Sequence, residues 1–203
     1  MIDIGATFIT FFAVVDPIGT VPVFIAVTSQ FDERAKRKIA LLATIAAAII
    51  LLFFVVAGEV ILRAMSIPLS AFQIAGGVVL FLFALTMIFG ESKPVSELRL
   101  AQDQHETAIF PIAVPSIASP GAMLAAVLLT ENDQFSIAEQ SQTFIVLLAV
   151  LALTYVLMLL SSLIERILGR SGPIVISRIM GLILASVAMT SLLSGIESYF
   201  GIA

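Results

Sequence analysis

The sequence Asp16-Pro17-Ile18-Gly19-Thr20-Val21-Pro22 interrupts an apolar run that extends from Gly5 to Thr28. The run is long enough to cross a bilayer, since about 20 apolar residues suffice. Each proline lacks an amide hydrogen and disrupts the preceding turn, so backbone carbonyls lose their helical partners. Such backbone is tolerated in a membrane only where protein buries it or a polar cavity receives it. The stretch therefore predicts a broken first span that lines a site.

Composition indicates a membrane protein. Of the 203 residues, 60% are hydrophobic and 12% are charged, whereas soluble domains are about 45–50% apolar and about 25% charged. The sequence shows no basic patch of the kind that binds nucleic acid, so we expect no such partner. It contains no cysteine, which excludes disulfides and thiolate metal sites. The N-terminal apolar stretch lacks a basic n-region and is expected to be a retained span.

The apolar runs predict an all-α, polytopic membrane protein with six transmembrane helices, at residues 5–28, 39–62, 68–90, 108–130, 142–165 and 173–198. Eight of the ten Lys and Arg residues lie in the first, third and fifth loops, and Arg63 is the one on the opposite side. Cytoplasmic loops are enriched in Lys and Arg. We therefore expect those three loops in the cytoplasm and both termini on the periplasmic side of the inner membrane.

Proline spacing indicates an internal repeat. Pro17 and Pro22 are separated like Pro115 and Pro120, and the pattern of residues 68–76 recurs at 173–181. With three spans in each half, the second copy enters the membrane inverted. Paired broken helices in inverted repeats point to a transport site near the midplane. The prediction is a single membrane domain, 1–203, made of repeat one (1–90), a cytoplasmic linker (91–107) and repeat two (108–203), with the first and fourth helices broken.

Asp16 lies near the centre of its span and has two interpretations. It can cap a half-helix that restarts after the break, or it can bind a substrate, an ion or a proton, because an intramembrane acid is costly without a function. The two are compatible, since a helix N-terminus also attracts anions. Asp16 is the candidate for proton coupling.

The fourth span contains Pro115-Ser116-Ile117-Ala118-Ser119-Pro120-Gly121 and no acid. Its hydroxyls and freed carbonyls can bind an ammonium group or Na⁺. The alternative is that Ser116 and Ser119 only satisfy the broken helix and allow close packing.

Gln73 and Arg178 occupy matching positions in the third and sixth spans. Arg178 either extends to the lipid headgroups or pairs with Asp16 or a substrate carboxylate. The glycines near them, Gly76-Gly77 and Gly181, are expected to allow close helix packing. Glu59 and Arg63 have the spacing of a surface ion pair.

An enzyme is not expected. An intramembrane serine protease needs a base beside its nucleophile, and the single histidine, His105, lies in the central loop. An aspartyl protease needs two deep acids, and a zinc enzyme needs several ligands that the spans lack. A membrane channel and a non-transporting structural or regulatory membrane protein stay open as alternatives.

Four segments, taken together and in this order, resemble the MarC family: Asp16–Pro22, Gln73–Gly77, Pro115–Gly121 and Ser177–Gly181. The similarity covers essentially the whole chain, and the family includes the SnatA-type small neutral amino acid transporters. The resemblance implies six spans in the inner membrane and proton-driven movement of glycine or alanine. Many members of the family have Asn where this chain has Asp16, which implies that exposed backbone is a more general ligand than a carboxylate.

The expected function is secondary transport of small neutral amino acids by alternating access, with H⁺ or Na⁺ as the coupling ion and no metal or cofactor. The expected partners are a small amino acid, the lipid bilayer and further copies of the chain. The candidate substrate-binding residues are Asp16, Pro17, Ile18, Gly19, Thr20, Pro115, Ser116, Ile117, Ala118, Ser119, Gly121, Gln73 and Arg178.

Overall fold

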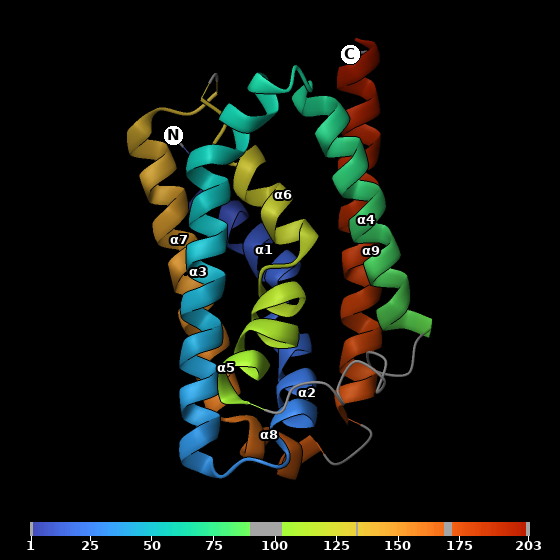
Figure 1. Cartoon of the computed structure of the whole chain (residues 1–203). Coiled ribbons are helices and arrows are strands. Elements are labelled where there is room, and N and C mark those ends of the chain that lie inside the picture. The colour runs from blue at the N-terminus through green and yellow to red at the C-terminus, as the bar shows by residue number, and fades with distance from the viewer. Residues whose placement is uncertain (1, 90–102, 133, 169–171, 202–203) are drawn as a thin grey trace.

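The computed structural model describes residues 2–89, 103–132, 134–168 and 172–201, and all regular secondary structure within these ranges is helical. The α-helices, labelled in Figure 1, are α1 (Ile4–Val15), α2 (Pro17–Thr28), α3 (Glu33–Ala64), α4 (Leu69–Phe89), α5 (Gln104–Thr107), α6 (Pro120–Leu128), α7 (Ile137–Leu159), α8 (Ser161–Leu168) and α9 (Gly172–Phe200). The π-helical segment η2 (Ala108–Ile117) lies between α5 and α6.

The predicted all-α fold is confirmed. Within the described ranges, five helices are long and apolar enough to cross a membrane, and the number is six if the pair Gln104–Ile117 and Pro120–Leu128, bent by 58°, forms a single span. The second span begins earlier than expected, at Glu33, because Asp32 caps it by accepting a hydrogen bond from the Ala35 amide at 2.9 Å.

Further predicted boundaries differ from the structure. The expected span 142–165 ends at Leu159, and the separate helix α8 begins at Ser161. Two consecutive serines follow Leu160, and serine favours helix starts over helix interiors. The expected linker 91–107 lies mostly outside the described residues, and its last four residues form α5.

The helices that correspond to each other in the predicted repeat run in opposite directions (Figure 1). α1 and α2 descend toward the end of the molecule where α8 lies, whereas η2 and α6 ascend from it; α3 and α7 are antiparallel, and so are α4 and α9. Both ends of the described chain lie at the same end of the molecule. These are the directions that two inverted repeats require, and the repeat itself stays a prediction.

The first span is the centre of the fold. Within its 18-residue apolar window, 50% of the residues are buried, whereas the corresponding share is at most 39% in α3, α4, α7 and α9. α3 presents small residues to the interior, and Ala40, Ala43 and Ala47 are all fully buried. Helix association in lipid depends on this kind of close packing between small residues.

Glycines allow α4 to approach its neighbours, as predicted. A Cβ atom on Gly77 would lie 3.0 Å from the Ala188 carbonyl of α9, and one on Gly76 would lie 2.6 Å from Leu124 of α6. A Cβ on Gly181 would lie 3.1 Å from the Ala84 carbonyl. The α4–α9 pair therefore packs backbone against backbone along its length.

Candidate functional site

The first break consists of one residue. Asp16 has φ 49° and ψ 66°, in the left-handed region, and it both ends α1 and begins α2. Its amide donates to the Phe12 carbonyl at 3.1 Å, and its carboxylate Oδ1 accepts from the Gly19 amide at 2.9 Å. Pro17 follows at the first helical position, where a missing amide hydrogen costs nothing. The expected cap is thus present, while Pro22 lies inside α2 without ending it.

Gly19 makes room for this cap. A Cβ atom at Gly19 would lie 1.9 Å from Asp16 Oδ2 and 2.6 Å from its Cγ. No side chain fits there while the carboxylate covers the first turn of α2. Asp16 and Gly19 therefore act as one local motif.

The second break is longer. In η2, Phe110 (φ −129°, ψ 126°) and Val114 (φ −130°, ψ 127°) are extended, as residues before proline tend to be. α6 then begins at Pro120 with Ser119 as its cap, and Ser119 Oγ accepts from the Ala122 amide at 3.1 Å. Ser119-Pro120 thus repeats the role of Asp16-Pro17, whereas proline spacing aligned Pro17 with Pro115.

Hydrogen bonds join the two breaks. Ser119 Oγ donates to the Val14 carbonyl at 2.7 Å, a contact between residues 105 apart in the sequence. In an unbroken helix that carbonyl would accept from the amide four residues later. The hydroxyl of the second half therefore satisfies backbone that the first half has released.

A second contact between the two breaks joins two hydroxyl groups. Thr20 Oγ1 donates to the Asp16 carbonyl at 3.0 Å and lies 3.3 Å from Ser116 Oγ. Because the Thr20 proton is committed to that carbonyl, Ser116 is the donor in the pair. Asp16, Thr20, Ser116 and Ser119 are 6%, 1%, 5% and 0% exposed, so all four lie in the interior of the helix bundle.

Charge is distributed unequally over the crossing. α2 and α6 both begin there, and each N-terminus carries a partial positive charge. Asp16 covers the first N-terminus with a carboxylate, while Ser119 covers the second with a neutral hydroxyl. The carbonyls at the end of α1 add partial negative charge. The site therefore offers one anion-attracting end and one cation-attracting end.

The remaining predicted residues divide into two groups. Pro17, Ile117, Ala118 and Gly121 are buried around the crossing, and Ile18, Gly19 and Pro115 are half-buried there.

Gln73 is half-buried in α4 and Arg178 is exposed on α9. In the described part of the chain, neither forms a hydrogen bond or an ion pair with the break residues. Binding roles for Gln73 and Arg178 stay predictions.

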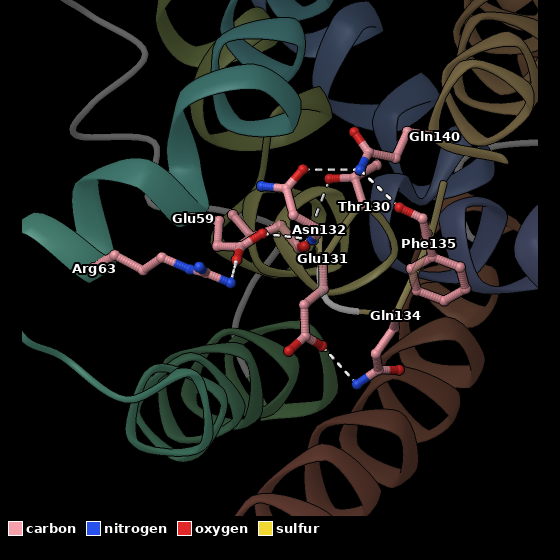
Figure 2. Close-up of polar contacts among 9 residues, drawn as sticks. Glu59, Arg63, Thr130, Glu131, Asn132, Gln134, Phe135 and Gln140 are labelled. Carbon is pink, nitrogen blue, oxygen red and sulfur yellow. Dashed lines mark hydrogen bonds and ion pairs between the residues drawn. The ribbon is translucent and has the colours of Figure 1, made fainter. Parts of the chain in front are cut away.

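Glu59 differs from the expected surface pair. It is 8% exposed, forms an ion pair with Arg63, and accepts a hydrogen bond from the Asn132 amide at 2.7 Å (Figure 2). Gln140 Nε2 donates to Asn132 Oδ1 at 2.9 Å in the same cluster. The carboxylate thus ties α3 to the loop after α6. The helical spacing of Glu59 and Arg63 predicts their ion pair. It cannot predict the hydrogen bond between Glu59 and Asn132, which are 73 residues apart in the sequence.

Across the described residues, no three His, Cys, Asp or Glu side chains gather as a metal site requires. The polar groups at the crossing are hydroxyls, one carboxylate and backbone, which can contact a small polar ligand through hydrogen bonds.

Comparison with known proteins agrees with the predicted family. The family model described as "MarC family integral membrane protein" matches residues 1–200 of the chain. A UPF0056 membrane protein of Methanocaldococcus jannaschii is 34% identical over 194 residues, covering 94% of each chain. The UPF0056 membrane protein YvbG of Bacillus subtilis is 32% identical over 198 residues, covering 95% of this chain and 93% of the relative.

The UPF0056 inner membrane protein YhgN of Escherichia coli is 33% identical over 186 residues, covering 92% of each chain. No solved structure matches. A whole-length family match, relatives of nearly equal length and a set of membrane-crossing helices agree with one another. The chain belongs to the MarC family of integral membrane proteins.

Proposed function

We propose that the chain is a secondary transporter of small neutral amino acids, with glycine and alanine as the first substrates to test. The observation that carries the proposal is the buried crossing of two broken helices, joined by the hydrogen bond from Ser119 to the Val14 carbonyl. Broken helices in opposed orientations form the binding sites of many secondary transporters. The name of the Escherichia coli relative supports an inner-membrane setting.

The charges at the crossing suit a zwitterion. In the proposed mode, the substrate carboxylate lies at the N-terminus of α6, where the cap is the neutral Ser119 hydroxyl. The ammonium group lies toward the Asp16 carboxylate and the carbonyls at the end of α1. Gly19, whose amide contacts the Asp16 carboxylate, and Ala118, next to Ser119, are small residues, which favours a small substrate. The same arrangement would disfavour a substrate with net charge.

The two contacts between the breaks support the proposed alternating access. Ser119 with the Val14 carbonyl and Ser116 with Thr20 each join one half of the chain to the other. Binding of a substrate replaces these contacts with its own polar groups, so the halves can part without leaving buried groups unpaired. The opposite directions of the paired helices (Figure 1) support a rocking motion of one repeat against the other.

Asp16 is the proposed site of proton coupling. Its carboxylate accepts from the Gly19 amide, and a proton on it weakens that bond and removes the charge that attracts an ammonium group. Among the described residues, Asp16 and Glu59 are the buried acids, and Asp16 is the one that lies at the crossing. Proton binding at Asp16 would thus alter substrate affinity directly. Na⁺ is the alternative coupling ion.

The proposed orientation places the end with α8 and the N-terminus of α3 in the cytoplasm and both termini in the periplasm. The proposal assigns no catalytic step to the chain and requires no cofactor.

Flux measurements in proteoliposomes test the proposal. Uptake of labelled glycine should saturate, and preloaded unlabelled glycine should accelerate it by exchange. Conductance without saturation would indicate a channel instead. If glycine, alanine and serine all show neither uptake nor exchange, the transport proposal is wrong and a structural role is favoured.

Asp16→Asn removes the negative charge and keeps the helix cap, because Asn caps helices about as well as Asp. This variant should fold, keep exchange and lose the stimulation of uptake by a pH gradient. Unchanged stimulation would reject Asp16 as the proton site. Ser136→Ala, at the exposed cap of α7, is the matched control for handling and reconstitution.

A further inference from the structure

A pocket of about 190 Å³ lies away from the crossing, between the C-terminus of α2, the N-terminus of α3 and the start of α8. These elements meet at the lower end of the molecule in Figure 1. The lining residues are Ile25, Thr28, Ser29, Lys36, Ser161 and Ser162. Nothing in the proposed transport site uses them.

The pocket lies at the depth of lipid headgroups if the crossing is at the midplane. α2 has 12 residues, and at 1.5 Å per residue it spans roughly 18 Å. Half of the hydrocarbon core is roughly 15 Å. The end of α2 therefore reaches the layer where phosphate groups are found.

Two hydroxyls in the pocket cannot donate to a ligand. Thr28 Oγ1 donates to the Phe24 carbonyl at 2.6 Å, and Ser29 Oγ donates to the Ala26 carbonyl at 3.1 Å. They offer only oxygen lone pairs to the pocket.

Ser161 is different. It is 6% exposed and has no hydrogen-bond partner within the described chain. No fully enclosed side-chain oxygen or nitrogen among the described residues is left unpaired, so the Ser161 hydroxyl keeps some exposed surface, and Ser161 lines the pocket. Ser162 lines the same space from the next position. Both belong to the first turn of α8, where the helix dipole is positive.

Lys36 supplies the charge. Its Nζ contacts Glu33 Oε1 at 3.0 Å, and the two side chains are 25% and 66% exposed. An ammonium group has three protons, so this pair leaves two for a ligand. Glu33 pairs with Lys36 from an exposed position, and none of the described residues that line the pocket carries a carboxylate. The pocket therefore combines one cation, two free hydroxyl donors and a helix N-terminus.

We infer that this pocket binds a phosphate group, with Lys36, Ser161 and Ser162 as donors to its oxygens. The group can come from the headgroup of a phospholipid or from free phosphate, and the chemistry at the pocket is the same for both. The inference is independent of the proposed transport function.

Native mass spectrometry of the full chain in neutral detergent, titrated with phosphatidylglycerol, tests the inference. One lipid should bind more tightly than the rest. Lys36→Met and Ser161→Ala should each weaken it about tenfold, the effect of losing a hydrogen bond to a charged group. Ser161→Thr, which keeps the hydroxyl, should restore binding.

Two control variants remove the same groups elsewhere. Lys38→Met and Ser141→Ala change an exposed cation and an exposed hydroxyl that do not line the pocket, and both should bind like the unmodified chain. Equal binding by all variants would overturn the inference. A loss with Lys36→Met alone would also overturn it, because that result indicates general charge attraction.

Competition identifies the source of the phosphate. If inorganic phosphate, at constant ionic strength with chloride, displaces the lipid, the pocket accepts free phosphate. If phosphate has no effect while the two pocket variants still weaken lipid binding, the pocket is a headgroup site. Either result supports a phosphate site.

Discussion

Replacing Ser119 with alanine tests whether the two breaks are coupled. Ser119 Oγ has two roles at once, since it accepts from the Ala122 amide and donates to the Val14 carbonyl. The residue is fully buried, so water cannot replace either bond. Ser119→Ala removes both bonds and adds no bulk.

The expected cost is the sum of two terms. Loss of a helix cap costs about 1 kcal/mol. Leaving the Val14 carbonyl unsatisfied in a buried setting costs about 1–3 kcal/mol. The free energy of unfolding should therefore fall by about 2–4 kcal/mol. Ser119→Gly separates the terms, because glycine is a tolerable cap, and it should lose only the Val14 contribution of about 1–3 kcal/mol.

Denaturation of the purified chain in mixed micelles, followed by far-ultraviolet circular dichroism, measures both variants. The matched control is Ser136→Ala, which removes the cap of α7 in an exposed setting and should cost about 1 kcal/mol. The informative quantity is the difference between Ser119→Ala and Ser136→Ala. If the two variants are equally stable, Ser119 is only a cap, and the proposed coupling of the breaks is refuted.

Three further predictions follow from single contacts. Gly19→Ala should destabilise the chain by about 1–3 kcal/mol in the same assay, because its Cβ would displace the Asp16 carboxylate; Gly5→Ala, in the first turn of α1, should cost less, because its Cβ would approach Asp3 Oδ1 only to 3.2 Å. Thr20→Val should cost about 1 kcal/mol through loss of its hydroxyl bonds, and Thr20→Ser should cost less; the reverse order would indicate that the methyl group matters more. Glu59→Ala should increase hydrogen exchange in residues 131–135, measured by mass spectrometry, and unchanged exchange would show that the loop holds without Glu59.

The sequence predicts the position of both breaks because their causes are local. A proline next to Asp or Ser combines a good cap with a residue suited to the first helical position, and Asp16-Pro17 and Ser119-Pro120 both do so. Gly19 adds a further local signal, since only glycine fits beneath the carboxylate. The half-helix starts could therefore be identified without any tertiary information.

The partners across the fold could not be predicted in the same way. Ser119 and the Val14 carbonyl are 105 residues apart, and a backbone carbonyl has no identity in the sequence that would mark it as an acceptor. Glu59 shows the same limit, because its helical neighbour Arg63 is readable from spacing while the Asn132 amide is not. The short α8 was missed because its serines are too few to interrupt an apolar pattern.

A helix begins at each of the two breaks, but the cap is a carboxylate in the first and a neutral hydroxyl in the second. This difference in charge determines how the proposed site should be interpreted. If exposed backbone is the general ligand, either cap suffices for binding, and Asp16 only adds a response to pH. Ser119 cannot supply that response, because a hydroxyl does not titrate in the accessible range. Under the proposed function, the two halves would therefore bind the two ends of one zwitterion while only the first half senses protons. In that proposal the difference between the caps is what couples a proton gradient to a neutral substrate, since only Asp16 changes charge.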